Sequence, residues 1–562
     1  MQTPWLQHYP PGVPAQANID AYRSLTDLLE AAFRRHPSRD ALACMDSRLT
    51  FRQLDELSQA LGAWLQSLGL ERGARVAVMM PNVPQYLVAI AAILRAGYVV
   101  VNVNPLYTAR ELEHQLVDSG AEAVIVLENF AHTLEECIDK TGVKHVLLAA
   151  MGDLLGFWRG RLINFAIRHV RRMVPEFSLP VDGGRTVTQF RDALEAGLRL
   201  SLKRVDVGPD DVAFLQYTGG TTGVSKGATL LHRNVVANIM QCEAWFKPML
   251  DRVGDQQQLT IVCALPLYHI FALTICALMG AHFGAMNLLI PNPRDIPGVV
   301  RTLAKYRINM FPAVNTLFNA LANDADFARL DFSGLVVSNG GGMAVQKGTA
   351  ERWLKVTGCP VVEGYGLSET SPVATSNRLD LQEFTGTIGL PVPSTEIAIR
   401  DDGDRDVPVG TAGEICIRGP QVMAGYWKRD DETAKVMTTD GYFKSGDIGI
   451  MDERGYIRIV DRKKDMILVS GFNVYPNEIE QVVSLHPGVL ECAAVGVADE
   501  RAGEAVKLFV VKNDPTLSEE DVASWCRDNF TAYKRPKYIE FRDELPKSNV
   551  GKILRRELRS HA

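Results

Sequence analysis

A loop rich in glycine and hydroxyl side chains is the strongest chemical feature of the sequence. It lies between a stretch that predicts a strand (212–216) and one that predicts a helix (233–241). Glycine allows positive φ and close backbone approach, so successive N–H groups can form a nest around phosphate oxygens, and hydroxyls and an ammonium add donors. We therefore expect phosphate binding rather than a plain loop. The candidate residues are Tyr217, Thr218, Gly219, Gly220, Thr221, Thr222, Gly223, Ser225 and Lys226.

The order of residues in this loop excludes the two commonest nucleotide motifs. Lys226 follows Ser225 and precedes Gly227, whereas the Walker A pattern requires G-x-x-x-x-G-K-[ST]. The loop does not match G-x-G-x-x-G either. A kinase or a motor-type NTPase is therefore disfavoured.

Two further segments could complete a nucleotide site. Three glycines (Gly340, Gly341 and Gly342) would let a flat ligand or an extended chain lie against the backbone. In EGYGLSETS (363–371), Tyr365 could stack on a base. Glu369 offers a hard oxygen ligand, suited to Mg²⁺ held jointly with phosphates. Taken alone, this second segment could equally be an ordinary turn with a surface glutamate.

Three charged residues in the C-terminal third complete the set. Asp447 in KSGDIG is a carboxylate that could accept hydrogen bonds from two vicinal ribose hydroxyls, and Arg462 in DRKKD could reinforce it. Lys552 lies on a turn bounded by Pro and Gly in PKSNVGKILRREL. A single lysine near a chain end is usually just a solvated charge, so Lys552 alone indicates little.

The elements that must position these residues predict an α/β fold. Helix-like and strand-like segments alternate at 51–70, 74–80, 86–97, 98–105 and 121–128, which is typical of mostly parallel sheets. From about 384 to 461, short strands and Gly/Asp turns predict an antiparallel β subdomain. A new α/β pattern begins at 462. We expect a large N-terminal domain (1–461) and a small mobile α+β domain (462–562).

Composition and charge narrow the class of protein. The chain has 562 residues, of which 46% are apolar and 22% charged, so it is globular and long enough for two or more domains. A net charge of −6 disfavours nucleic-acid binding. The nine cysteines show no metal-binding spacing and are expected to be buried free thiols in a reducing compartment. No signal peptide is visible at the N-terminus, which favours the cytoplasm.

A long uncharged segment raises the question of a membrane span. Residues 256–293 contain no Asp, Glu, Lys or Arg, and the centre (269–290) is long enough to cross a bilayer. Gly280, His282, Gly284 and Asn287 interrupt it, however, and no cluster of Lys or Arg flanks it. We therefore predict buried core, because parallel sheets covered on both faces contain such apolar strands.

A second segment combines basic and apolar residues. Residues 154–175 hold five arginines and no acid, interleaved with aromatic and aliphatic side chains. Such a helix could touch anionic lipid. It could also be an amphipathic helix that packs on the body and leaves a solvated basic face. The pattern by itself favours the second interpretation.

The series YTGGTTGVSKG, YGLSE, SGD, DRKKD and PKSNVGK resembles the acyl-adenylate-forming superfamily of acyl-CoA synthetases, luciferases and peptide-synthetase adenylation domains. The resemblance covers about residues 25–560. Residues 440–480 resemble the signature segment of fatty acyl-CoA synthetases. The segments 102–116, 266–274 and 541–558 look most like those of bacterial long-chain fatty acid–CoA ligases. One departure is Ser445, where most relatives have Thr.

The resemblance implies a two-step ligase with ATP and coenzyme A as co-substrates. A fatty carboxylate attacks the α-phosphorus of ATP to form acyl-AMP, and the coenzyme A thiolate then displaces AMP. It also implies that Thr218 and Glu369 hold Mg²⁺ and that Lys552 lies between the carboxylate and the α-phosphate. The ATP/AMP pocket would further include Gly341, Gly342, Glu363, Tyr365, Gly366, Leu367, Ser368, Thr370, Asp447 and Arg462.

The resemblance further implies a rotation of the small domain between the two steps, about a hinge at Lys464. The face used for the coenzyme A step would carry Ser470, Gly471 and Phe472. An acyl pocket would include His269, Ile270, Phe271, Gly340 and Gly341. Peripheral contact with an anionic membrane, on the inner face of the cytoplasmic membrane, and a homodimer are left open.

Two alternatives remain at this point. The chain could adenylate another carboxylic acid or use another acceptor. It could also be an inactive nucleotide-binding, membrane-associated protein.

Overall fold

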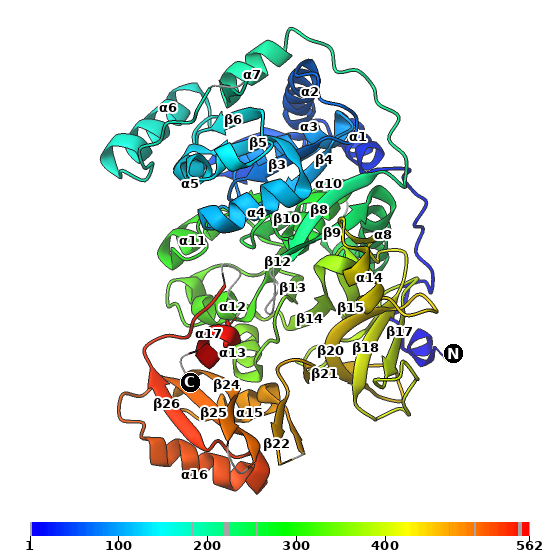
Figure 1. Cartoon of the computed structure of the whole chain (residues 1–562), viewed down its shortest axis with the longest axis vertical. Helices are drawn as coiled ribbons and strands as arrows, with labels where there is room; N and C mark the ends of the chain where they lie inside the picture. Colours follow the sequence, from blue (N-terminus) through cyan, green and yellow to red (C-terminus); the bar gives the residue numbers. More distant parts are fainter. Residues whose placement is uncertain are drawn as a thin grey trace.

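The computed structural model describes residues 3–181, 184–218, 225–254, 257–470, 472–499, 502–548 and 553–560. Four β-sheets with their covering helices make up these residues (Figure 1). The expected fold class is confirmed: two large, mostly parallel sheets, an antiparallel sheet and a smaller C-terminal α+β unit. The domain boundary between residues 461 and 462 stays a prediction.

The first large sheet has eight strands. It is parallel from β8 to β7 and antiparallel at β9 and β19. In spatial order its strands are β19 (Gly425–Tyr426), β9 (Lys226–Leu231), β8 (Val212–Thr218), β4 (Val99–Asn102), β3 (Arg75–Met79), β5 (Ala121–Leu127), β6 (His145–Ala149) and β7 (Thr186–Gln189).

The second large sheet has nine strands and is parallel through its centre, from β14 to β1. In spatial order its strands are β16 (Leu390–Pro391), β15 (Val373–Ser376), β14 (Val361–Gly366), β13 (Val337–Gly340), β12 (Met310–Ala313), β10 (Thr260–Cys263), β11 (Met286–Leu289), β1 (Asp40–Cys44) and β2 (Ser47–Thr50).

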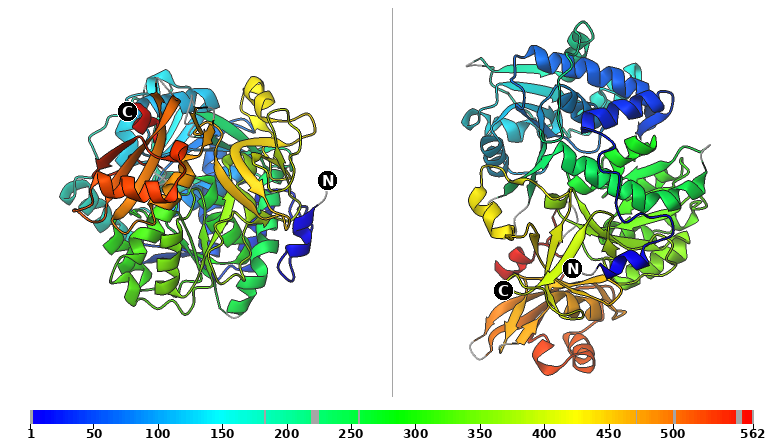
Figure 2. Two further views of the ribbon diagram at one scale, coloured as in Figure 1. Left: turned by 90° about the horizontal axis from the view of Figure 1, so that it is seen from below. Right: turned by 90° about the vertical axis from the view of Figure 1, so that its right-hand side faces the viewer.

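Two smaller sheets follow in the C-terminal third. An antiparallel sheet is formed by β17 (Glu396–Arg400), β18 (Gly413–Arg418), β20 (Phe443–Met451) and β21 (Ile457–Arg462). The last sheet contains β23 (Phe472–Val474), β22 (Ile467–Val469), β25 (Gly503–Lys512), β24 (Val489–Asp499) and β26 (Tyr538–Arg542). Figure 2 shows this last sheet at one end of the molecule, next to the antiparallel sheet.

Helices cover both faces of the eight-stranded sheet, as the apolar strands predict. Val76 and Val78 of β3 belong to a core shared with α2 (Phe51–Ser67) and α3 (Pro84–Arg95). The alternate residues Ala77 and Met79 join a second core with α4 (Ala109–Ser119). Successive side chains of a strand point to opposite faces. This is why one short strand supplies two separate cores.

Several helix boundaries follow from local chemistry. The Thr50 hydroxyl accepts from the N–H of Gln53, and the Gln53 side chain reciprocates at the start of α2. Thr108 and Glu111 form the same capping box at the start of α4. The other helices used below are α1 (Leu25–Arg35), α6 (Phe157–Phe165), α7 (Phe190–Gly197), α8 (His232–Leu250), α14 (Asp430–Val436), α15 (Pro476–Val483), α16 (Glu519–Asn529) and α17 (Arg555–Ser560).

The uncharged segment is core, as predicted. Strands β10 and β11 lie side by side within the nine-stranded sheet, and the helical turns of residues 270–283 connect them. Ile275 and Leu278 are 1% and 2% exposed. Within the described residues, no helix combines the length and apolar character needed to cross a bilayer. The nine cysteines are buried and free, also as predicted.

The prediction for residues 154–175 is wrong in one respect. The segment is helical, as α6 and a π-helical turn (Ala166–Val170). Leu155 and Ile167 are buried, but most of its large apolar side chains do not pack on the body. Trp158 is 75% exposed and Leu162 is 69% exposed. The inward face instead carries Gly160 and Asn164, because a close backbone contact leaves no room there for larger groups.

Candidate active site

Two antiparallel strands hold the ends of the glycine-rich loop. Thr218 at the end of β8 pairs with Lys226 at the start of β9, and the Ser225 hydroxyl donates to the Thr218 carbonyl at 2.7 Å. The Tyr217 hydroxyl donates to Asp118 of α4 at 2.5 Å. Burial, together with the Asp118 carboxylate, raises the pKa of Tyr217 far above its ordinary value. The expected phosphate ligands Gly219, Gly220, Thr221, Thr222 and Gly223 lie outside the described residues.

Lys226 and Glu369 converge through two residues that the sequence did not single out. Lys226 Nζ donates to Glu432 Oε2 of α14 at 2.5 Å and lies 4.8 Å from the centre of the Tyr426 ring. The Tyr426 hydroxyl donates to Glu369 Oε1 at 2.7 Å. Lys226 and Lys435 hold the pKa of Glu432 well below its usual range. Burial raises the pKa of Glu369. The site therefore contains a buried carboxylate, Glu369, and a lysine, Lys226, that forms an ion pair with Glu432.

A second cluster joins the nine-stranded sheet to the antiparallel sheet. The Tyr365 hydroxyl of β14 donates to Asp447 Oδ2 at 2.7 Å, and Arg462 Nε lies 3.2 Å from Asp447 Oδ1. Asp447 and Arg462 are cross-strand partners in β20 and β21. Burial, followed by the charge of Asp447, raises the pKa of Tyr365 well above its ordinary value. The three residues that the sequence associated with adenosine are thus in contact.

A tight turn after β14 holds residues 366–370, the rest of the expected nucleotide-binding segment. Gly366 ends β14, and a Cβ there would lie 1.7 Å from the Pro372 carbonyl oxygen, so this close approach requires glycine. The Leu367 N–H donates to the Thr370 hydroxyl at 2.9 Å. Ser368–Thr370 form a short 3₁₀ turn that carries Glu369.

The triple-glycine segment meets the expected acyl-pocket segment. A Cβ on Gly341 would lie 3.0 Å from the Phe271 ring, and one on Gly340 would clash with Val345. His269 caps the helical turn that contains Ile270 and Phe271, and its Nδ1 accepts from the Phe271 N–H at 3.3 Å. The structure thus brings Gly341 and Phe271 together, and it assigns His269 Nδ1 a capping role.

Glu363 is a buried carboxyl beside this contact. Its Oε1 accepts from the Val345 N–H at 2.8 Å. Burial raises the pKa of Glu363 to about 8, because an ionised carboxylate without a cationic partner loses its hydration. Glu363 therefore stays largely protonated at neutral pH. A neutral carboxyl can donate a hydrogen bond as well as accept one.

The expected hinge lies where side-chain contacts change from one unit to the other. Lys463 pairs with Glu414 of β18 at 3.1 Å, whereas Asp465 pairs with Arg559 of α17 at 3.0 Å. Lys464 lies between them and is exposed. A hydrogen bond crosses this point: Asp461 Oδ2 accepts from the Asn477 N–H of α15 at 2.9 Å. Burial raises the pKa of Asp461 to about 6.

The C-terminal unit presents the other expected residues. Ser470 has a φ of +50° and its N–H donates to the Ala502 carbonyl at 2.8 Å. Phe472 is 56% exposed and stacks on Tyr533 with ring centres 4.7 Å apart. Gly471 and Lys552 lie outside the described residues. On either side of the segment with Lys552, Lys547 and Ile553 form an antiparallel bridge.

The donor set near the loop fits Mg²⁺ of the kind that is shared with phosphates. Such a cation takes one or two protein oxygens and completes its shell with water and substrate. The Thr218 hydroxyl donates to the Lys226 carbonyl, so its oxygen keeps lone pairs, and the 3₁₀ turn with Glu369 packs against β8 and β9. Among the residues that the structure describes, no cluster of three or more His, Cys, Asp or Glu could hold a metal alone.

Sequence reasoning missed Tyr426, Glu432 and Asp118. They are separated in sequence from their partners by 57, 206 and 99 positions. Only the adjacent aromatic pair Tyr426–Trp427 was a local sign, and such a pair usually belongs to a core. Their place in the site follows from the pairing of β19 with β9, which no local pattern indicates.

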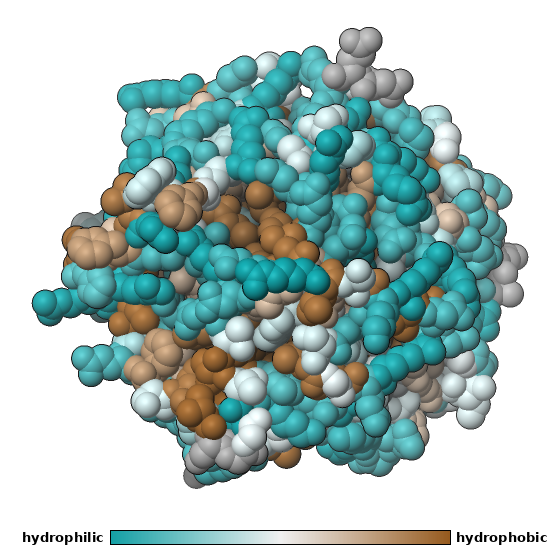
Figure 3. Space-filling model, turned by 90° about the horizontal axis from the view of Figure 1, so that it is seen from above, coloured by the Kyte–Doolittle hydropathy of each residue, from teal (hydrophilic) through white to brown (hydrophobic). Residues whose placement is uncertain are grey.

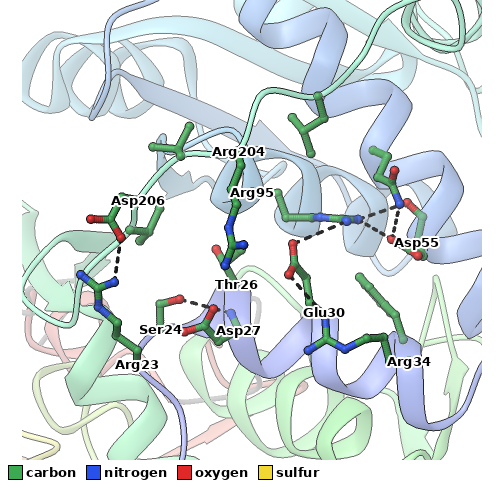
Figure 4. A pocket seen from close by; sticks show the side chains of 15 residues that line it. Arg23, Ser24, Thr26, Asp27, Glu30, Arg34, Asp55, Arg95, Arg204 and Asp206 are labelled. Carbon is green, nitrogen blue, oxygen red and sulfur yellow. Dashed lines mark hydrogen bonds and ion pairs between the residues drawn. The ribbon is translucent and has the colours of Figure 1, made fainter.

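A cavity of about 510 Å³ lies away from these residues (Figure 4). It is bounded by α1, α2 and residues 202–207, and none of the expected site residues lines it. Arg23 pairs with Asp206 at 2.7 Å, and Arg95 pairs with Asp55 at 2.8 Å. Most of the charged side chains around this cavity are therefore paired with one another. We conclude that the cavity is not a binding site for an anion.

Comparison with known proteins agrees with this geometry. The family model described as "AMP-binding enzyme" matches residues 29–427, and that of its C-terminal domain matches residues 478–552. A long-chain-fatty-acid–CoA ligase of Escherichia coli O6:H1 is 55% identical over 563 aligned residues, covering 100% of this chain and 99% of the relative. That of Bacillus subtilis is 36% identical, covering 99% and 98%.

A solved structure extends the comparison to the fold. A crystal structure of an anthranilate CoA ligase in complex with anthranoyl-AMP has a TM-score of 0.83 at 25% identity, covering 96% of this chain and 97% of that one. On the family models and the full-length identity, the chain belongs to the AMP-binding enzyme family.

Proposed function

We propose that the protein is a long-chain fatty acid–CoA ligase that forms AMP. The similarity to bacterial enzymes of that name over the full chain carries this proposal. The site geometry supports it: a carboxylate–tyrosine–arginine cluster suits a ribose, and a glycine-rich loop flanked by Lys226 suits phosphates.

The first step requires positive charge where two anions meet. The carboxylate oxygen forms a bond to the α-phosphorus, the bond to pyrophosphate breaks, and acyl-AMP results. The carboxylate is already ionised at neutral pH, so no base is needed. Lys552 neutralises the carboxylate and α-phosphate, and Lys226 exchanges Glu432 for phosphate oxygens. Asp447 accepts from the ribose hydroxyls. Mg²⁺ bound to Glu369 and Thr218 would supply charge neutralisation on the phosphates.

The second step requires access for a thiolate. The C-terminal unit turns about Lys464, which removes Lys552 and brings Ser470, Gly471 and Phe472 toward the site. The exposed ring of Phe472 supports this, because a face that docks only in one state must otherwise be solvated. Sulfur then attacks the acyl carbon and AMP leaves.

The acyl chain is held by the apolar segment around Phe271 and Gly341. A buried methylene contributes roughly 0.8 kcal/mol, so a few methylenes separate long acids from short ones. We place the protein in the cytoplasm, with access to the inner face of the membrane, because long-chain acids partition into bilayers.

The test is an assay of AMP formation with acids of short, medium and long chain, with and without coenzyme A. The proposal expects AMP and acyl-CoA with the highest kcat/KM for long chains. A preference for aromatic or short-chain acids would mean that the protein is an adenylate-forming enzyme with a different substrate. The absence of AMP with every acid would indicate an inactive nucleotide-binding protein instead.

Lys552→Ala tests the division between the two steps. Acyl-AMP formation should slow by about 10²-fold or more, because charge is neutralised only there. Thioester formation from supplied acyl-AMP should persist. Lys547→Ala is the matched control: Lys547 is five positions away and pairs with Glu491 at 2.7 Å. Equal loss in both half-reactions would remove Lys552 from the proposed role.

Glu369→Gln tests the metal assignment. The variant should need a higher Mg²⁺ concentration for half-maximal adenylation, since it lacks the carboxylate charge. Tyr426→Phe keeps that carboxylate but removes the hydrogen bond that orients it, and should give a smaller shift in the same direction. An unchanged Mg²⁺ dependence in Glu369→Gln would exclude Glu369 as a ligand.

A further inference from the structure

Helix α6 exposes its apolar face to solvent. Phe157, Trp158, Leu162 and Phe165 are 58%, 75%, 69% and 59% exposed, and Val170 in the π-helical turn is 70% exposed. Helical spacing places the first four on one half of the helix, together with Arg161, whose guanidinium carbon lies 4.2 Å from the centre of the Phe157 ring. Figure 3 views the end of the molecule that carries α6 and α7, where brown side chains interrupt a hydrophilic surface. Monomeric proteins rarely leave such a contiguous patch without a binding role.

Polar and backbone contacts hold the opposite side of the helix. A Cβ on Gly160 would lie 2.0 Å from the Gly152 carbonyl oxygen, so the backbones touch. Asn164 Oδ1 accepts from the Gly152 N–H at 2.6 Å. Asn129 Nδ2 donates to the Met173 carbonyl at 2.9 Å near the end of the segment. The helix is therefore fixed with its apolar side outward.

The five arginines of the segment divide into two groups. Arg159 pairs with Asp46 at 3.3 Å, and Arg168 pairs with the buried Glu128 at 2.7 Å. Arg161, Arg171 and Arg172 are exposed and form no ion pair with any described residue. These three remain available to an anionic partner, although the whole chain carries a net charge of −6.

A basic cavity adjoins the apolar face. It measures about 350 Å³, and its charged lining has four groups that are basic or can become so against two acids. They are Arg161, Arg168, His169 and Arg191 against Asp153 and Asp192. Arg168 is paired with Glu128 and Arg191 with Asp153, so Arg161 and His169 are the basic groups of this lining that form no ion pair with a described residue. At the surface of a bilayer, phosphate headgroups lie above the acyl chains. The cationic side chains can contact the headgroups while the exposed apolar side chains of α6 contact the acyl chains.

We propose that α6 and the π-helical turn after it form a membrane-docking element, which inserts its aromatic and leucine side chains among the headgroups of an anionic bilayer. The purpose of this element, to collect a long-chain acid from the bilayer, rests on the proposed function. The binding of the element to the bilayer does not. The element lies at the end of the molecule opposite the C-terminal sheet (Figure 1). A bilayer there leaves the C-terminal unit free to turn.

The test is co-sedimentation of the full chain with vesicles of phosphatidylcholine alone, or mixed with phosphatidylglycerol. Wild type should bind the mixed vesicles, and salt should weaken binding. Trp158→Ser/Leu162→Ser should reduce partitioning about ten-fold or more. Arg171→Gln/Arg172→Gln should reduce it about five-fold per arginine on mixed vesicles only. Val409→Ser, at a residue 57% exposed elsewhere, is the matched control.

Binding that ignores lipid charge, or that survives both double variants, would overturn the proposal. A change of oligomeric state in Trp158→Ser/Leu162→Ser, measured by light scattering, would assign the face to a second copy of the chain and would overturn it too. The proposed function fails separately. If wild type makes no AMP with any acid but still binds vesicles, the docking element stands and the ligase assignment does not.

Discussion

The uncharged segment 256–293 and the arginine-bearing segment 154–175 place the same residue type in opposite surroundings. The first contains no charged residue and lies in the core, as its composition suggests, with Leu278 2% exposed. The second contains five arginines, yet Leu162 is 69% exposed. The same residue type is thus buried in one segment and solvated in the other.

The difference arises from the neighbours that each segment has. β10 and β11 lie in the interior of the nine-stranded sheet with a parallel strand on each side, and every residue of both strands is buried. α6 follows β6 at the edge of the eight-stranded sheet, where the last strand β7 is itself only partly covered. Hydropathy describes what a segment can bury, and topology decides whether anything is there to bury it against.

The largest expected effect is at the buried leucine. Leu278→Ser removes apolar contacts and buries a hydroxyl, and should lower the free energy of unfolding by about 4 kcal/mol or more. Urea titration followed by circular dichroism measures it. Ile275→Val, a milder change one turn away, should cost only about 1 kcal/mol. A loss near zero for Leu278→Ser would mean that the segment is not core.

Burial also acts on an ionisable group beside this core. Burial raises the pKa of Glu363 to about 8 from an ordinary 4.5, so folding favours the protonated form. Its contribution to stability is complete below the unfolded pKa and is lost as pH rises through about 8.

Between about pH 5 and pH 7, wild type should lose on the order of 2–3 kcal/mol of unfolding free energy relative to Glu363→Gln. Denaturant titrations of both proteins across pH measure the difference. Parallel pH curves for the two proteins would contradict the buried, protonated state.

On the exposed segment, polar anchors should matter more than apolar side chains. Arg168→Gln leaves the Glu128 carboxylate buried without its bidentate partner, and should cost about 2 kcal/mol of stability. Arg172→Gln is the control on the same segment, since Arg172 pairs with no described acid. Equal stability of the two variants would mean that the ion pair does not anchor α6.

The smallest expected effect on stability is that of a leucine-to-serine substitution in the exposed segment, the same change as in Leu278→Ser. Leu162→Ser in α6 should change the free energy of unfolding by less than about 0.5 kcal/mol, because the side chain is already solvated. The same denaturation assay used for Leu278→Ser applies. A large loss would show that the outer face of α6 is packed against another part of the protein in solution.

Local patterns predicted the elements well. The strand before the glycine-rich loop, the helix at Phe51–Ser67 and the antiparallel strands between residues 396 and 462 agree with expectation, whereas the strand after the loop, β9, was not predicted. Ordered motifs also identified Glu369, Asp447 and Arg462, and the structure places the last two in contact. Sequence did not reveal Tyr426 or Glu432, because their contacts join strands and helices far apart in the chain.

The sequence by itself determined which groups are available: a phosphate-binding type of loop, acids and a lysine in a recognisable order, and an uncharged stretch long enough for a core. Tertiary structure alone decided which way α6 faces. A close contact between the backbones of Gly152 and Gly160 holds α6 by the face that carries its small residues. Its large apolar side chains therefore point to solvent, or to a membrane. Periodicity is the same for an inward and an outward apolar face, and only the packing partner tells them apart.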